Sequence, residues 1–163
     1  MKRKLPLYAV FISLACIFSY VESMIPFYFG VPGMKLGLPN LVVLIALYQF
    51  GPLSAIVISL TRVLLTGFMF GNAFSIVYSI AGACLSFLVM FLLKKYAKIN
   101  IILISIFGGI FHNIGQLIIA ILIVDNYHVA YYAPFLIIAG IICGCINGII
   151  ANEVIKRIHD FIY

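Results

Sequence analysis

Charged side chains are scarce in this 163-residue chain. Only 9% of its residues are Asp, Glu, Lys or Arg, whereas 66% are hydrophobic and the mean hydropathy is +1.27. A soluble domain of this length could not cover its surface with so few polar groups, but a bundle of helices in lipid needs none. The composition therefore excludes a soluble domain and predicts an all-α integral membrane protein.

Acidic residues are the scarcest charge, with four against ten basic residues. A site that holds magnesium on a substrate diphosphate needs clustered aspartates, because the hard cation takes several oxygen ligands. This chain has two aspartates, Asp125 and Asp160, far apart in the sequence. The sequence also lacks a P-loop and any Ser/His/Asp or thiol-based catalytic arrangement. These absences favour a protein that is not itself an enzyme and that holds no metal ion or cofactor.

The sequence gives no sign of a disulfide, a cysteine metal site or a cleaved signal peptide. The four cysteines all lie inside apolar runs, and Cys143 and Cys145 would fall on different faces of a helix, which predicts packing roles rather than a disulfide or a metal site. The first apolar run continues to Met24 without a small-x-small cleavage site. We therefore expect it to be retained as a membrane span rather than removed as a signal peptide.

Six apolar segments separated by short breaks make up one predicted domain over residues 1–163. A span needs about 20 residues to cross roughly 30 Å of hydrocarbon, and the second segment, with about 13 residues, reaches only about 20 Å. Either this segment is tilted against its neighbours, or the Pro- and Gly-rich stretch before it dips into the protein to complete the crossing. The predicted segments are Leu5 to Met24, Leu38 to Phe50, Pro52 to Phe70, Ala73 to Leu93, Ile101 to Val124 and Tyr131 to Ile155.

Eight of the ten basic residues fall at three places, Lys2-Arg3-Lys4, Lys94-Lys95-Lys98 and Lys156-Arg157. Basic residues that flank membrane spans mark the cytoplasmic side. With six spans, both termini and the middle cluster are therefore predicted to be cytoplasmic. An anionic leaflet accounts for the formal charge of +6, so a lipid bilayer and not a nucleic acid is the expected partner.

The two remaining basic residues indicate a binding site. Arg62 lies near the middle of the third segment, and it must face the interior because a guanidinium in lipid costs several kcal/mol. His112, Asn113 and Gln116 lie near the middle of the fifth segment, with His112 and Gln116 on one helix face. We predict that Lys35, in the outer loop, and Arg62 bind an anionic or carbonyl-rich solute whose polar edge these three residues contact.

Two structural alternatives remain open for these residues. Arg62 could be a staple that bonds helix carbonyls, and His112 could be an interior histidine with one donor and one acceptor partner. No carboxylate is expected in this interior, because all four acidic residues, Glu22 among them, fall at segment ends or in loops. The aromatic residues of the outer loop, Phe27 to Phe29, could cover a ligand or anchor the loop at headgroup depth.

Small residues at four-residue spacing predict close helix contacts, where lipid offers no hydrophobic drive for association. The sixth segment has Gly140, Gly144 and Gly148 on one face, which we expect to meet either another helix of the bundle or a partner. The first segment has two such pairs. They are Ala9 with Ser13 and Ala15 with Ser19.

Four stretches of this sequence resemble the small bacterial membrane proteins called Gx transporters, a family that often carries the name heptaprenyl diphosphate synthase component I. The stretches are GMKLGLPNL from Gly33, YQFGPL from Tyr48, RVLLTG from Arg62 and FHNIGQ from Phe111. More distantly, the chain is similar to the substrate-binding S components of energy-coupling factor importers. We include Asn40, within the first stretch, among the candidate binding residues.

The resemblance implies two functions. In the first, a six-helix subunit in a bacterial cell membrane captures a small, vitamin-like solute and works with separate transmembrane and ATPase subunits. S components dock through small residues of their first span, a pattern that Ala9/Ser13 and Ala15/Ser19 match only approximately. In the second, the chain is a non-catalytic accessory subunit in prenyl diphosphate or quinone-linked metabolism.

Overall fold

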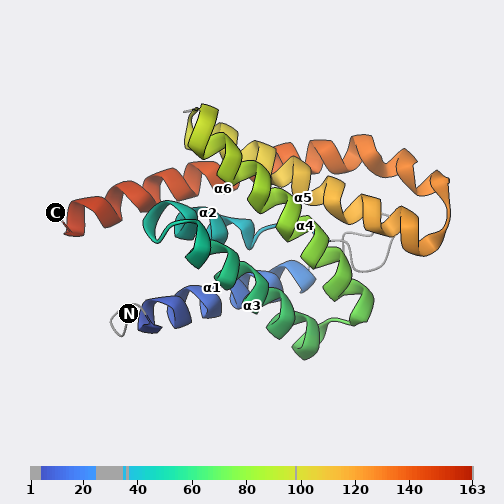
Figure 1. Ribbon diagram of the computed structural model, residues 1–163, viewed down its shortest axis with the longest axis horizontal. Coiled ribbons are helices and arrows are strands. Elements are labelled where there is room, and N and C mark those ends of the chain that lie inside the picture. Colours follow the sequence, from blue (N-terminus) through green and yellow to red (C-terminus); the bar gives the residue numbers. More distant parts are fainter. Residues whose placement is uncertain (1–4, 25–34, 36, 98, 163) are drawn as a thin grey trace.

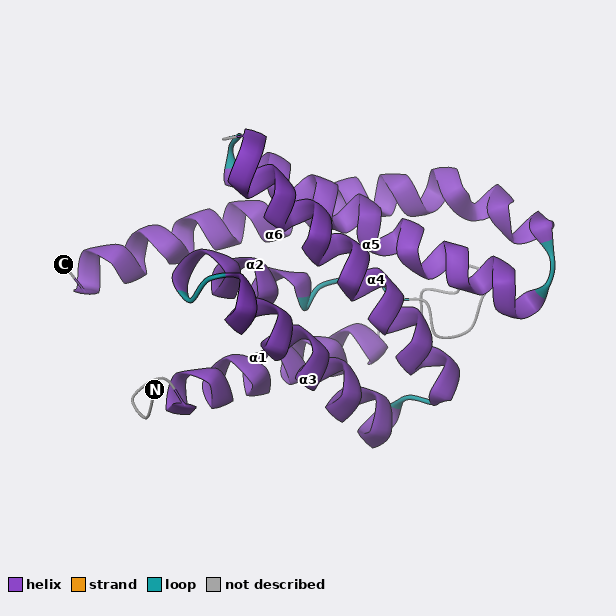
Figure 2. Ribbon diagram, viewed as in Figure 1, coloured by secondary structure: helices purple, strands orange, loops and turns teal. Residues whose placement is uncertain are grey.

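The computed structural model describes residues 5–24, 35, 37–97 and 99–162, with side chains described to residue 158 (Figures 1 and 2). The aromatic residues Phe27 to Phe29, the basic cluster Lys2-Arg3-Lys4 and Lys98 lie outside these residues. In the part that the structure describes there are helices and short turns but no strand. The elements are α1 (Leu5–Met24), α2 (Asn40–Gln49), α3 (Pro52–Phe70), α4 (Ala73–Leu92), the π-helical η1 (Leu93–Ala97), α5 (Ile101–Val124), the 3₁₀-helical η2 (Tyr127–Tyr132) and α6 (Ala133–Ile162).

The predicted all-α membrane protein is confirmed. Five of the described helices are long and apolar enough to cross a membrane, namely α1, α3, α4 with η1, α5, and η2 with α6. The local sequence explains where several of them begin. Gly51 has a φ of 87° and Pro52 occupies the first turn of α3, whereas the side chains of Asn72 and Asn100 accept backbone N–H groups at the starts of α4 and α5.

The last helix differs from the predicted segment Tyr131 to Ile155. A 3₁₀ turn precedes it, and α6 itself continues to Ile162. The predicted segment is defined by its apolar residues and ends at Ile155, after which apolar residues are sparse. The backbone continues as a helix because Glu153 and Arg157 are good helix formers, and their side chains form an ion pair of 2.9 Å at i,i+4 spacing.

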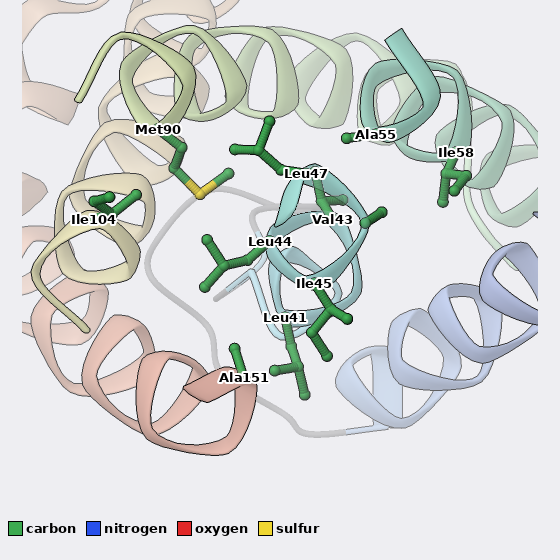
Figure 3. Packing of buried hydrophobic residues seen from close by; sticks show 11 residues of the cluster. Leu41, Val43, Leu44, Ile45, Leu47, Ala55, Ile58, Met90, Ile104 and Ala151 are labelled. Atoms are coloured by element: carbon green, nitrogen blue, oxygen red, sulfur yellow. The ribbon is translucent and has the colours of Figure 1, made fainter. Parts of the chain in front are cut away.

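The short helix α2 lies in the centre of the bundle. Eight of its ten residues are buried, and Figure 3 shows its side chains meeting Met90, Ile104 and Ala151 from other helices. A helix that is apolar all round is expected in such a place. Lys94 covers its far end, where Nζ donates to the Leu47 carbonyl at 2.7 Å and supplies a cation at the helix C-terminus.

The described residues just before α2 lie in the protein interior, and whether they complete a membrane crossing stays a prediction. Gly37 and Pro39 are both buried. Gly37 has a φ of 92°, and a Cβ there would lie 3.2 Å from the His112 ring. Glycine is therefore needed both for the backbone conformation and for the close approach.

Glycines bring α6 against α5. A Cβ at Gly144 would lie 2.6 Å from the Cα of Ile106, and a Cβ at Gly140 or Gly148 would lie 2.9 or 2.7 Å from the α5 backbone. The predicted glycine face is thus an interface within the bundle. In α1, Ala15 and Ser19 are buried against the bundle, whereas Ala9 and Ser13 are exposed.

The ends of the helices divide between two sides of the molecule. In Figure 1 the start of α1, the end of α4 and the end of α6 all lie toward the left, and the turn from α3 to α4 and the η2 segment lie toward the right. The end of α4, which leads into η1 with Lys94 and Lys95, and the last part of α6, which carries Lys156 and Arg157, therefore lie toward the same side. Which side of a membrane that end faces stays a prediction.

Candidate functional site

Buried polar side chains come from all six α-helices, and several of them contact the backbone of Lys35, Gly37 and Leu38. A buried polar group without a hydrogen-bond partner lowers the stability of the fold. Each of these side chains is therefore expected to bond either another part of the chain or a bound ligand. The nearly fully buried ones include Ser19, Glu22, Asn40, Ser59, Arg62, Ser79, Ser86, His112, Asn113, Gln116 and Asn147.

Gln116 of α5 holds the backbone of Lys35. Its amide oxygen accepts from Lys35 N at 2.8 Å, and its amide nitrogen donates to Lys35 O at 3.2 Å. The same nitrogen lies 2.6 Å from His112 Nε2. If the amide donates there, His112 is neutral with its proton on Nδ1. Both ends of the Gln116 amide are therefore engaged by this chain.

Two further side chains hold the next residues. Glu22 of α1 accepts with Oε1 from the backbone N–H groups of Gly37 and Leu38, the latter at 3.1 Å. Asn147 of α6 donates to the Gly37 carbonyl at 3.2 Å. Side chains from α1, α5 and α6 thus hold the backbone of Lys35, Gly37 and Leu38.

Arg62 is the most deeply buried charge, with an exposed fraction of 1%. Its Nη1 donates to Ser19 Oγ at 3.2 Å, but its Nε and Nη2 have no hydrogen-bond partner among the described residues. Glu22 Oε2 also has no hydrogen-bond partner among the described residues. Ser19 and Glu22 are three residues apart on one face of α1, so the two charges face the same interior.

The other predicted binding residues are engaged within the bundle. Asn113 Nδ2 donates to the Leu136 carbonyl at 2.7 Å, although its Oδ1 has no partner among the described residues. Asn40 Nδ2 donates to Ser86 Oγ at 3.3 Å. The structure thus brings His112, Gln116 and Asn40 together around Lys35 and Gly37. Arg62 contacts α1 at Ser19, and Asn113 contacts α6 at Leu136.

Lys35, predicted in the outer loop, is only partly exposed. Its side chain is half-buried, and burial lowers the pKa of its amine; Glu22 opposes that shift and Arg62 adds to it. These three are the charged groups in electrostatic range of one another. The described residues contain no group of three or more His, Cys, Asp or Glu side chains that could hold a metal ion.

The expectation that no carboxylate reaches this interior is wrong for Glu22. Its position at the end of α1 suggested the surface, but residues 37–38 fold back over the helix end and bury the carboxylate. The spacing of Ala15, Ser19 and Glu22 along one face was the available signal. Asn147 was also missed, although it lies between Gly144 and Gly148 on a face that the glycines mark as interior.

A family model for heptaprenyl diphosphate synthase component I matches residues 11–154. The chain belongs to this family. The family resemblance seen in the sequence is confirmed, whereas the comparisons show no similarity to S components. No curated protein and no solved structure shows significant similarity to the chain.

The description of this family agrees better with the accessory-subunit function than with uptake. The term "component I" implies that a second subunit exists. It does not say what kind of protein that subunit is. Nothing in the comparisons concerns transport.

Proposed function

We propose that this member of the component I family is a non-catalytic membrane subunit that binds a small polar ligand at Arg62. The observation that carries the proposal is the buried guanidinium with two nitrogen atoms unpaired among the described residues. An uncompensated buried charge costs several kcal/mol. A carboxylate, phosphate or carbonyl oxygen of a ligand would compensate it with charge-assisted hydrogen bonds.

The alternative function of Arg62, as a staple between helices, has weaker support. A staple would bond helix carbonyls through most of its five N–H groups. Arg62 instead has one side-chain partner, the Ser19 hydroxyl. Removing a staple would destabilise the protein, whereas removing a ligand-binding arginine would chiefly lower ligand affinity.

The direct test measures how much of a small molecule the protein retains through purification. The wild-type protein and the Arg62→Gln variant are purified in mild detergent, denatured, and the released small molecules are quantified by mass spectrometry. A charge-assisted bond is worth about 1.5–3 kcal/mol, so the variant should retain a bound molecule roughly 10- to 150-fold more weakly. Arg157→Gln, at an exposed arginine, is the matched control. Equal retention by folded Arg62→Gln protein would contradict the proposal.

The family description favours one purpose for this binding. In that version the chain is the membrane component of heptaprenyl diphosphate synthesis, and a separate soluble subunit carries out chain elongation. The measurement is the rate of heptaprenyl diphosphate formation by the candidate elongating subunit, with and without this chain in the same lipid. A rate or product length that changes when this chain is present supports a function in heptaprenyl diphosphate synthesis. The same rate and product length with and without the chain reject it.

A second purpose, uptake, is favoured by the position of the site. Side chains of this interior hold the backbone of Lys35, Gly37 and Leu38, which precede α2 on the side that the basic residues predict to be extracellular. In this version a separate ATP-driven module supplies the energy. Uptake of the retained molecule into proteoliposomes, measured with and without ATP and that module, separates this purpose from the first.

A further inference from the structure

We infer that the ligand of this site must offer a hydrogen-bond donor as well as an acceptor, and that Glu22 takes the donor. The inference rests on the proposed binding function and adds a second recognition residue to it. It also defines a chemical class, namely molecules with an acidic or carbonyl group close to an N–H or O–H group. Amino acids, hydroxy acids and acidic lactams belong to that class, and simple carboxylates do not.

The first step concerns the two oxygens of Glu22, which have different environments. Oε1 accepts from the N–H groups of Gly37 and Leu38, whereas Oε2 has no hydrogen-bond partner among the described residues. The bonds of Oε1 to the backbone fix the orientation of the carboxylate, so Oε2 is held in place. An ionised carboxylate can only accept, and its missing partner must therefore be a donor.

The second step concerns the distance between Glu22 and Arg62. Ser19, which accepts from Arg62 Nη1, lies one helical turn before Glu22 on α1. No ion pair within 4.0 Å joins Arg62 or Lys35 to Glu22 in the part of the chain that the structure describes. An acceptor-only group and a donor-only group thus lie on one interior face, each with unpaired atoms. Opposite charges that are buried together gain by direct contact, so keeping them apart is costly unless another group lies between them.

The third step concerns what can satisfy both groups. A ligand with only an acceptor would pair with Arg62 and leave Glu22 buried and unpaired, which is costly. A ligand with only a donor would do the reverse. A molecule that presents both groups a few Å apart compensates both charges at once, and the interior would reject analogues that lack either group.

The test compares Glu22→Gln with wild-type protein. Glutamine keeps an oxygen for Gly37 and Leu38 but places an NH₂ group, a donor, where Oε2 would accept from the ligand. The small molecules that the wild-type protein retains through purification are the probe, quantified as for Arg62. We expect Glu22→Gln to lower the retained amount at least about tenfold. Glu153→Gln, at an exposed acid on α6, should retain the wild-type amount.

Each outcome decides a different point. Unchanged retention by folded Glu22→Gln protein overturns the inference and leaves the proposed binding at Arg62 intact. A retained molecule without any N–H or O–H donor also overturns it, with no need for a variant, which covers the case in which Glu22→Gln does not fold. If the wild-type protein retains no molecule, both the inference and the proposed function fail.

Discussion

At the scale of single residues, the buried polar side chains serve two purposes. Gln116, Asn147 and one oxygen of Glu22 form hydrogen bonds to the backbone of Lys35, Gly37 and Leu38. Two nitrogen atoms of Arg62 and the other oxygen of Glu22 have no partner among the described residues. Bonds of the first kind fix a fold. Unpaired charges of the second kind lower its stability and are retained where a protein needs them for binding.

Gln116 should therefore matter for stability before it matters for binding. Gln116→Leu leaves the backbone N–H and carbonyl of Lys35 without their partner, which costs about 1–3 kcal/mol for a buried group. We expect a lower melting temperature in detergent, measured by intrinsic fluorescence. Gln49→Leu is the matched control, because no hydrogen bond holds that side chain among the described residues. An unchanged melting temperature for Gln116→Leu would mean that the contact with Lys35 is not stabilising.

At the scale of helices, periodicity and polarity in the sequence predicted most of what is observed. The limits of α1, α3 and α5 agree with the predicted segments, because Gly, Pro and Asn at their ends end or cap helices locally. What could not be predicted depends on contacts distant in the sequence. The burial of Glu22 requires residues 37–38 to fold back over α1, and no local pattern encodes that contact.

The interface of α5 with α6 supplies a prediction at this scale. Gly144→Leu should force the two helices apart, because even a Cβ would lie 2.6 Å from the backbone of Ile106. Real contacts of Cβ atoms are longer, and the lost packing is not replaced by a hydrophobic drive in lipid. We expect a clear loss of thermal stability in detergent. Ile146→Leu, at a side chain that is 48% exposed, should leave the melting profile unchanged.

At the scale of the whole molecule, the basic residues and the helix ends give a topology that can be measured. We expect Ala97→Cys to be protected from an impermeant thiol reagent in intact cells and Tyr127→Cys to react, each in a background without the four native cysteines. Permeabilised cells, in which both positions should react, provide the control. Labelling of position 97 from outside intact cells would reject the predicted orientation.

The central position of α2 has a consequence for how this protein is made. Ten residues of helix span about 15 Å, half the thickness of the hydrocarbon region, so α2 cannot insert as an independent unit. Its neighbours Met90, Ile104 and Ala151 and its covering residue Lys94 all come later in the chain. During translation, α2 therefore lacks part of its packing contacts until α4, α5 and α6 have been synthesised. A chain that stops after α3 would leave α2 without the contacts that α4, α5 and α6 make with it.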